Sequence, residues 1–379
     1  MSPFIHLASA NAAAQVAFPG LGLDFSISRA AVFIGPLTIY WYGIIVVTGI
    51  GLGVLYAVWR AGQFGINKDR LSDVLLYVII VGMVGARAYY VAFSWDYYKL
   101  HPEEIIQIWK GGIAFYGGIL AAILCGWLLC RRWKLPVVRA LDACLGGLLL
   151  GQSIGRWGNF VNVEAFGGYF KGPWRMVSPL IDSYFHLHPN LLPGFSPEQV
   201  LQMQNIPVHP TFFYESAWTM LGFLFIVWYT KRRRFNGELT LLYFFINGLG
   251  RTVIEGLRTD SLMAGGIRVS QVLAGCMVLL SAALWFAARR KLSSGAAPAW
   301  LPLTSQSDAA EAVKAPAPPL DAQQMQSPAA KSEESAVIAA PQEVSPGENT
   351  AAPPDENAAA ATQAESVKSA ADTPPDRAD

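Results

Sequence analysis

One short stretch of the chain, GRWGNFVNVEAFGG at residues 155–168, gathers side chains that could bind and transform a charged substrate. It follows the apolar run LDACLGGLLLGQSI, yet it supplies Arg156, Asn159, Asn162 and Glu164 within nine residues. An arginine can bind a phosphate through paired hydrogen bonds, and a carboxylate can move a proton or hold an arginine in place. The asparagines can orient a polar headgroup. Together these types suit chemistry on a phospholipid headgroup.

Further polar residues fall at the ends of other apolar segments. They are Tyr42, Arg87, Tyr116, His209, Tyr214, Glu215, Arg251, Glu255 and Arg258. Arg251 and Glu255 are four residues apart, which places both on one face of a helix. Interfacial snorkelling, aromatic anchoring and simple ion pairs would explain any one of these residues. Snorkelling and aromatic anchoring would also produce part of the pattern, but scattered ion pairs have no reason to share one depth in the membrane. We therefore interpret the set as a functional site.

Other kinds of chemistry find no support in the sequence. His186 and His188 have only Asp182 as a nearby carboxylate, so no metal-type spacing is present and we expect no metal or other cofactor. There is no P-loop and no G-x-S-x-G elbow, and nothing indicates a nucleic-acid partner. The four cysteines lie within apolar segments and are interpreted as small hydrophobic residues.

The elements that must position these residues are membrane-spanning helices. The chain is 53% hydrophobic and only 15% charged, and a helix needs about 20 apolar residues to cross a bilayer. We therefore predict an all-α polytopic membrane protein of about seven spans. They are residues 33–59, 71–93, 112–130, 140–156, 211–230, 239–257 and 268–288. The fourth is short and glycine-rich, which predicts a helix packed in the interior.

The orientation of the spans follows from their Lys- and Arg-rich connections, because short cytoplasmic loops carry the excess of these residues. Such clusters follow the predicted spans 1, 3, 5 and 7. We therefore predict an extracytoplasmic N-terminal segment at 1–32, a seven-span domain at 33–292 with an extracytoplasmic insertion at about 157–210, and a cytoplasmic C-terminus. All the candidate site residues then lie toward the outer leaflet. The N-terminus does not resemble a cleavable signal peptide, so the first span is expected to direct its own insertion.

The end of the chain has a different composition. From residue 301 onward there are 13 Asp and Glu against 4 Lys and Arg, and no Phe, Trp or Tyr. Such a segment has little to bury. We predict that residues 293–379 form a disordered acidic tail.

The residues at 155–168 also resemble a known signature. They match that of bacterial prolipoprotein diacylglyceryl transferases, Gly-Arg-x-Gly/Ala-Asn-Phe-apolar-Asn-x-Glu-x-x-Gly, at every specified position. Supporting matches occur in order along the chain, as WYG at 41–43, GGIAFYGG at 111–118, HPTFFYE at 209–215 and GRTVIEGLR at 250–258. The resemblance covers about residues 30–290 and excludes the tail.

This resemblance implies an activity. Members of the family transfer the diacylglyceryl group of phosphatidylglycerol to the thiol of the lipobox cysteine in preprolipoprotein signal peptides, which forms a thioether and releases glycerol phosphate. It implies a multi-pass enzyme of the bacterial inner membrane that acts on membrane lipid in the first step of lipoprotein maturation. The residues expected to be catalytic are Arg156, Arg251, Glu164, Asn159, Glu255, Tyr116 and His209. Those expected to bind substrate are Arg156, Tyr42, Arg87, Asn162, Gly167, Tyr214, Glu215 and Arg258.

The sequence departs from part of the family at two positions. Some members have a histidine in place of Tyr116 and a tyrosine in place of Asn247. The histidine is a candidate base for the thiol, and a tyrosine is a poor base at neutral pH. Either Glu164, His209 or Glu255 takes the proton, or the arginines promote thiol ionisation without a dedicated base.

Two other classes of protein are less consistent with the sequence. A transporter would be expected to carry charges through both halves of the membrane or to show an inverted repeat of spans. The inner halves of the predicted spans are nearly free of charge, with Asp142 the clearest exception. A structural protein of the envelope would leave the spacing of Asn159, Asn162 and Glu164 unexplained.

Overall fold

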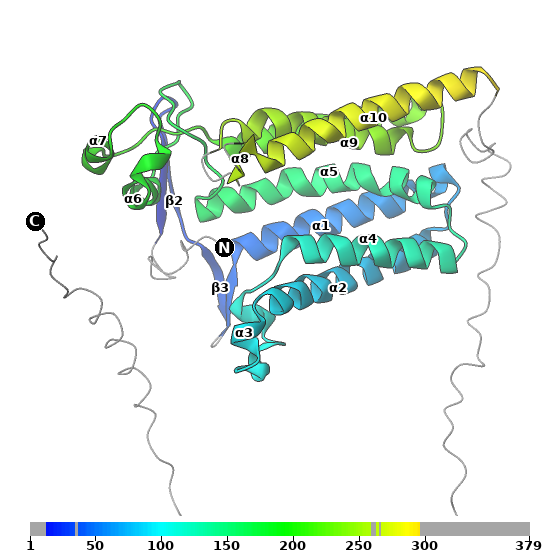
Figure 1. The fold of residues 1–379 in the computed structure, drawn as a ribbon, viewed down its shortest axis with the longest axis horizontal. Coiled ribbons are helices and arrows are strands. Elements are labelled where there is room, and N and C mark those ends of the chain that lie inside the picture. Colours follow the sequence, from blue (N-terminus) through cyan, green and yellow to red (C-terminus); the bar gives the residue numbers. More distant parts are fainter. Residues whose placement is uncertain (1–12, 35–36, 259–262, 265–266, 296–379) are drawn as a thin grey trace, which may run out of the picture. The chain divides into compact units, whose positions relative to one another are not determined.

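The computed structural model describes residues 13–34, 37–258, 263–264 and 267–295, and its described part consists mainly of long helices that run side by side (Figure 1). They are α1 (Trp41–Arg60), α2 (Lys68–Phe93), α4 (Phe115–Arg132), α5 (Val137–Asn162), α8 (Thr211–Tyr229), α9 (Glu238–Glu255) and α10 (Val269–Ser293). The predicted all-α, polytopic fold class is confirmed. Residues 1–12 and, within the predicted tail, residues 296–379 lie outside the described part.

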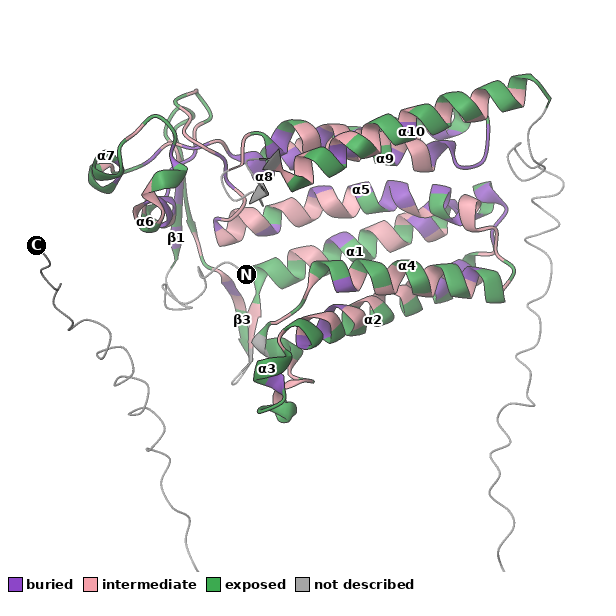
Figure 2. Ribbon diagram, viewed as in Figure 1, coloured by how far each residue is buried: buried purple, intermediate pink, exposed green. Residues whose placement is uncertain are grey.

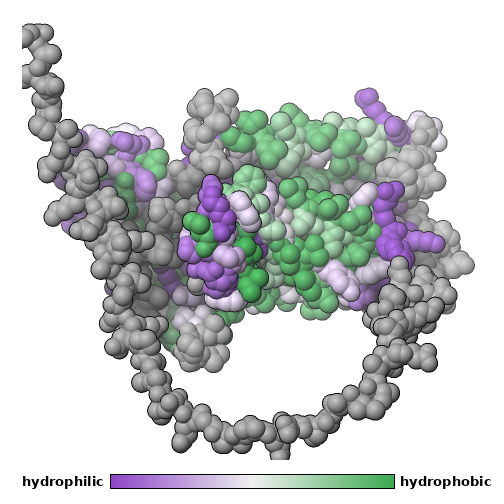
Figure 3. Space-filling view, turned by 60° about the horizontal axis from the view of Figure 1, so that its bottom comes forward, coloured by the Kyte–Doolittle hydropathy of each residue, from purple (hydrophilic) through white to green (hydrophobic). Residues whose placement is uncertain are grey.

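Most of these helices can cross a membrane. Within the described part, all except α9 are long and apolar enough to do so. Figure 3 shows the apolar surface as a band between hydrophilic groups at the two ends of the helices. The 18 residues of α9 include Glu238, Arg251 and Glu255, and both glutamates are buried inside the protein. Because its charges face protein rather than lipid, α9 can lie among the spans despite its lower apolarity.

The glycine-rich helix α5 lies in the interior, as predicted. It packs against α1 on one side and against α8 and α9 on the other, whereas α2 pairs with α4 and α10 with α9 (Figures 1 and 2). A Cβ atom on Gly53 would lie 2.6 Å from the carbonyl oxygen of Gly147, and one on Gly49 would lie 3.0 Å from that of Gly151. These glycines therefore allow the backbones of α1 and α5 to approach closely.

Two of the predicted helix boundaries differ from the structure more than the others do. The first span was placed from residue 33, but the chain forms the antiparallel strands β3 (Ala30–Ile34) and β4 (Leu37–Tyr40) before α1 begins at Trp41. These strands are rich in β-branched and aromatic residues, and Pro36 cannot continue a helix without losing a hydrogen bond. The fourth span was ended at residue 156, but α5 continues to Asn162. Arg156 and Asn159 therefore lie within the last two turns of the helix.

A small folded head occupies one end of the helices and contains residues 163–210 (Figure 1). The sequence had left open the fold of residues 169–208 within it. The antiparallel strands β1 (Ala14–Phe18) and β2 (Leu23–Ile27) join it, because Ala17 pairs with Val177. Helices α6 (Pro179–Leu187) and α7 (Pro197–Gln202) complete it. Its hydrophobic core includes Val16, Phe185 and Val200, which are at most 1% exposed.

Short elements make the remaining connections. They are η2 (Ala61–Phe64), α3 (Trp95–Tyr98), η3 (Pro102–Glu104), η4 (Ile108–Lys110), η5 (Pro189–Leu191), η6 (Thr230–Arg232), β5 (Met263–Ala264) and β6 (Ile267–Arg268).

Candidate active site

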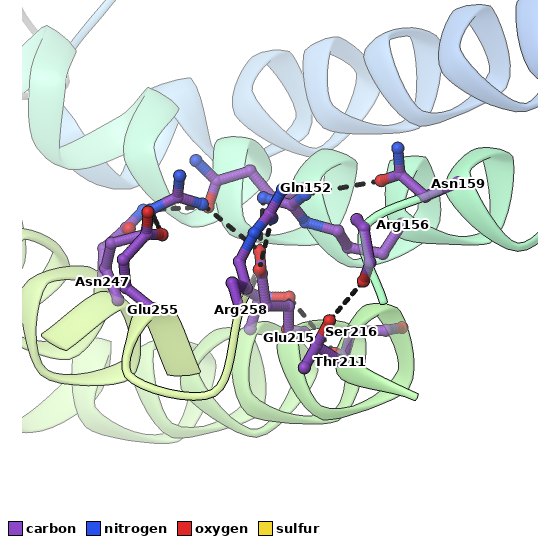
Figure 4. A network of polar contacts seen from close by, with 12 residues as sticks. Gln152, Arg156, Asn159, Thr211, Glu215, Ser216, Asn247, Glu255 and Arg258 are labelled. Atoms are coloured by element: carbon purple, nitrogen blue, oxygen red, sulfur yellow. Dashed lines mark hydrogen bonds and ion pairs between the residues drawn. The ribbon is translucent and has the colours of Figure 1, made fainter. Parts of the chain in front are cut away.

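Glu215, on α8, lies at the centre of an arginine cluster at the head end of the helices (Figure 4). Its side chain is only 8% exposed and forms ion pairs with Arg156 of α5, with Arg251 of α9 at 3.6 Å, and with Arg258 at 3.2 Å. Each partner comes from a different part of the chain, so the cluster exists only when α5, α8 and α9 are packed together. We call these four residues the Glu215 cluster.

The three arginines differ in how much of each remains accessible. The side chains of Arg156 and Arg251 are 27% and 35% exposed, whereas that of Arg258 is 12% exposed. Arg251 also pairs through its Nε with Glu255 at 3.1 Å. Three arginines and two glutamates give the linked residues a net charge of +1. The cluster therefore presents two partly exposed guanidinium groups, those of Arg156 and Arg251, which suit an anionic ligand.

A row of polar residues on α9 continues from the cluster into the bundle. Tyr243, Asn247, Arg251 and Glu255 follow one another at intervals of four, so they share one face of the helix. Asn247 Nδ2 donates to Gln152 Oε1 of α5 at 2.9 Å and to the Tyr243 hydroxyl at 3.1 Å. The sequence analysis missed Gln152 and Tyr243. Their spacing could have indicated both residues. Tyr243 lies four residues before Asn247 on α9, and Gln152 lies four residues before Arg156 on α5.

The end of α5 holds the signature residues in a constrained loop. Arg156 Nη1 donates to Asn159 Oδ1 at 3.4 Å, and Asn162 Nδ2 donates to Glu164 Oε1 at 3.1 Å. Val163 and Ala165, on either side of Glu164, both have positive φ angles, of 55° and 54°. This conformation is unfavourable for residues other than glycine, and especially for a β-branched one. The surrounding contacts therefore fix Glu164 in a loop that the local sequence would not choose.

The N-terminal segment contributes an arginine that the sequence analysis missed. Arg29, between β2 and β3, donates through Nη2 to the carbonyl oxygen of Asn162 at 3.1 Å. An isolated arginine outside the predicted spans carried no signal, because its partner lies 133 residues later in the chain.

Gly167 lies at a junction of three segments. Its N–H donates to the carbonyl oxygen of His209 at 2.8 Å, and the N–H of Gly168 donates to that of Leu257 at 2.9 Å. A Cβ atom on Gly167 would lie 2.7 Å from the Leu257 oxygen and 2.9 Å from the His209 Cβ. Close packing alone therefore requires glycine at this position.

His209 and Tyr214 lie beside this junction in an aromatic group. The His209 ring stacks on Phe170 with centroids 4.0 Å apart, and its Nδ1 is 3.2 Å from the Tyr214 hydroxyl. Trp174 Nε1 donates to the same hydroxyl at 2.7 Å. Burial lowers the pKa of His209 below its usual value, because it disfavours the charged imidazolium. His209 is therefore mainly neutral at pH 7.

Arg87 has partners other than the Glu215 cluster. Its guanidinium donates to the carbonyl oxygens of Glu104, Ile105, Gly111 and Gly112 at 2.6–2.8 Å. Four of its five N–H groups are thus used to hold the loop that follows α2.

Two predicted tyrosines are exposed. Tyr116 is 59% exposed near the start of α4, and its ring contacts Phe115. Tyr42 is 40% exposed at the start of α1, with its ring against Gly158 of α5. Tyr42 therefore lies beside the signature helix. Among the described residues, no group of three His, Cys, Asp or Glu side chains is placed to hold a metal ion.

This fold and this cluster together define a class: a multi-pass membrane protein with a cationic, carboxylate-braced site at one end of its spans. Comparison with known proteins gives the family. Residues 29–287 match the family described as prolipoprotein diacylglyceryl transferase. The phosphatidylglycerol–prolipoprotein diacylglyceryl transferase of Geobacillus kaustophilus is 39% identical over 269 residues, which cover 70% of this chain and 94% of the relative. That of Finegoldia magna is 38% identical over 252 residues, which cover 66% and 92%.

The chain belongs to the prolipoprotein diacylglyceryl transferase family. The resemblance inferred from the motif at 155–168 is thereby confirmed.

Proposed function

We propose that this chain transfers the diacylglyceryl group of phosphatidylglycerol to the cysteine thiol of a prolipoprotein, the first step of lipoprotein maturation. The observation that carries the proposal is the Glu215 cluster, which offers two partly exposed arginines and a net positive charge at one end of apolar helices, in a member of this family. Phosphatidylglycerol carries one negative charge on its phosphodiester. Its headgroup therefore matches the charge of the site, and its acyl chains match the surrounding membrane.

Arg156 and Arg251 are the residues that we assign to the lipid phosphate. In the reaction the cysteine sulfur attacks the glycerol carbon that carries the phosphate, a carbon–sulfur bond forms, and the carbon–oxygen bond to phosphate breaks. The phosphodiester becomes a phosphomonoester, so negative charge grows on the departing group. Two guanidinium groups that are already in place stabilise that growing charge more than they stabilise the starting lipid.

The carboxylates serve to hold the arginines. Glu215 forms ion pairs with all three arginines, and Arg258 is the least exposed of them, so the Glu215–Arg258 pair helps to fix the positions of Arg156 and Arg251. Glu255 holds Arg251 from the other side. Asn159 braces Arg156, while Asn162 orients Glu164.

The thiol proton needs an acceptor, and His209 suits this role best among the candidates. Burial keeps its imidazole neutral and therefore able to accept a proton. Glu255 is 2% exposed and paired with Arg251, so it is poorly placed to meet a peptide. Glu164, whose Oε1 accepts from Asn162 at 3.1 Å, is a second candidate.

We further propose that the site faces the outer leaflet of the bacterial inner membrane, where the lipobox cysteine of a prolipoprotein signal peptide would arrive. Basic residues in the last turns of α4 and α10 and just after α8 support this orientation, since they gather at the end of the helices away from the head. They are Arg131, Arg132, Lys231, Arg232, Arg290 and Lys291.

The test is to incubate the purified protein with phosphatidylglycerol and a lipobox peptide and to measure the peptide mass. We expect the mass to increase by one diacylglyceryl group, and we expect no increase for a peptide with serine in place of cysteine. Phosphatidylcholine, whose headgroup is zwitterionic, should not replace phosphatidylglycerol. The absence of an adduct from stable protein would refute the proposed activity.

A further inference from the structure

A second arginine cluster lies at the opposite end of the helices from the Glu215 cluster. Arg60 ends α1, and Arg139 and Arg233 both bind the turn η2 that follows it. Arg139 donates to the carbonyl oxygen of Phe64 at 3.3 Å, and Arg233 Nη2 donates to that of Gln63 at 2.9 Å. Arg60 and Arg139 lie close enough to Arg233 to repel its charge. Three guanidinium groups thus meet around one short turn.

This cluster contains buried N–H donors that the described residues leave without acceptors. Arg60 is only 4% exposed, and its Nε and Nη2 atoms have no hydrogen-bond partner within the described part. Arg233 Nη1 also has no hydrogen-bond partner there, although the nearby charge of Asp142 offsets part of the charge of Arg233. A guanidinium group stays charged at any physiological pH, and a buried charge without a partner is strongly unfavourable. The rings of Tyr56 and Trp59, with centroids 5.7 and 5.6 Å from the Arg60 Cζ atom, offset only part of this cost.

The nearby carboxylates are occupied by other donors. Asp142 accepts from the N–H of Gly237 at 2.7 Å and from the N–H and hydroxyl of Thr240 at 2.8 and 2.7 Å. Glu238 accepts from Tyr229 at 2.8 Å and from Trp285 at 3.0 Å. Three arginines against these two carboxylates leave an excess of one positive charge. The donors that remain therefore call for an anion with several acceptor oxygens, as in a phosphate group.

An apolar groove adjoins Arg60 on the outside of α1. It is lined by Leu52, Leu55, Tyr56 and Trp59 and has a volume of about 360 Å³, within the range of ligand pockets. Tyr56 and Trp59 belong both to the groove and to the contacts of Arg60. The groove therefore runs along one membrane-crossing helix and lies beside a buried cation. That combination fits a molecule with an apolar chain and an anionic head.

We propose that Arg60, Arg233 and the α1 groove bind one anionic phospholipid, in the leaflet opposite to that of the Glu215 cluster. The phosphate accepts hydrogen bonds from Arg60 and Arg233, and an acyl chain lies in the groove between Leu52 and Trp59. Basic pockets between transmembrane helices commonly hold such headgroups. This lipid is not the substrate of the proposed transfer, because the two clusters lie at opposite ends of α1 and α5.

The test is to titrate the full-length protein in detergent with phosphatidic acid and to count the bound lipids by native mass spectrometry. Arg60→Gln should weaken the binding of one lipid by about tenfold or more, the loss expected for charge-assisted hydrogen bonds. Arg132→Gln, an exposed arginine at the same end of the helices, should leave binding unchanged. Phosphatidylcholine should bind at this position at least about tenfold more weakly, and inorganic phosphate at the lipid's concentration should not compete.

A second variant keeps the test decisive if Arg60→Gln does not fold. Leu55 is 64% exposed, so Leu55→Trp should fill the groove without disturbing the core and should also weaken the binding of one lipid. Leu76→Trp, on the exposed face of α2 at 57%, is its control and should have no effect. Equal binding by Arg60→Gln and wild type, or by Leu55→Trp and wild type, would overturn the proposal. Because binding rather than transfer is measured, failure here would leave the proposed activity unaffected.

Discussion

Removing the charge of Glu215 tests the centre of the proposed active site. In Glu215→Gln, three arginines lose their shared anion while the shape of the side chain is kept. Breaking a buried ion pair by removing one partner costs about 3–5 kcal/mol. The loss should be near the lower value, about 3 kcal/mol, because the side chains of Arg156 and Arg251 are 27% and 35% exposed and can turn toward water. At about 2–4 °C per kcal/mol, the melting temperature should fall by roughly 6–12 °C.

The assay is thermal unfolding of the purified protein in detergent, followed by tryptophan fluorescence, together with the mass-based transfer assay. Phosphatidylglycerol should raise the melting temperature of Glu215→Gln more than that of wild type, because its phosphate replaces part of the missing negative charge. Transfer should fall sharply, since Arg156 and Arg251 are no longer held. Glu198→Gln, on the exposed surface of the head, is the control and should leave both properties unchanged. If Glu215→Gln melts within about 1 °C of wild type and transfers normally, Glu215 does not organise the site.

Four further changes test other parts of the structure. Arg156→Lys should lose most transfer activity while the protein still inserts, because lysine cannot make the paired hydrogen bonds of a guanidinium. Gly167→Ala should destabilise the protein by about 1–3 kcal/mol, because its Cβ would lie 2.7 Å from the Leu257 oxygen. The pKa of His209 is lowered in the folded protein, so the unfolded chain takes up the proton first as the pH drops through about 6.5, and the folded state loses stability. His209→Gln should therefore reduce the fall in melting temperature between pH 7.5 and 5.5. In a cysteine-free background, a cysteine at 198 should react with an impermeant thiol reagent added outside the cell, and one at 134 should not.

Each of these changes has a matched control and a contrary result. Arg132→Lys should keep full activity, and an active Arg156→Lys would refute phosphate binding by Arg156. Gly51→Ala meets no atom within 4 Å and should be tolerated, and equal stability of Gly167→Ala would refute the packing role of Gly167. His101→Gln, at an exposed site, should leave the pH response as in wild type, and an unchanged pH response of His209→Gln would refute the role of His209 in it. Labelling at 134 but not at 198 would reverse the proposed orientation.

The helices could be predicted from the sequence because runs of about 20 apolar residues have few other uses. All four members of the Glu215 cluster were also among the predicted site residues, since charged residues near the ends of such runs are costly and stand out. The hairpin of β3 and β4 was mistaken for helix, because hydropathy alone does not separate a short apolar strand from the start of a span.

The pairing within the site could not be predicted in the same way. Glu215 was expected to contact substrate, and the sequence did not indicate that Arg156, Arg251 and Arg258 would converge on it. That convergence depends on how α5, α8 and α9 are rotated against one another, which a single sequence does not encode locally. Arg29 illustrates the same limit, since its hydrogen bond to Asn162 joins distant segments. The fold of the head likewise depends on pairing between segments far apart, such as Ala17 with Val177.

The junction at Gly167 lies between the helix ends that position the arginines and a segment of the head, residues 169–208, whose sequence can vary. The backbone at 167–168 is hydrogen-bonded to His209 and Leu257, so the segments that leave α5, enter α8 and leave α9 are held together at the base of the head. Residues 169–208 can therefore lengthen, shorten or change sequence in evolution without moving the arginines. Sequence variation between family members is expected to concentrate in this part of the head, while the arginines of the Glu215 cluster keep their positions.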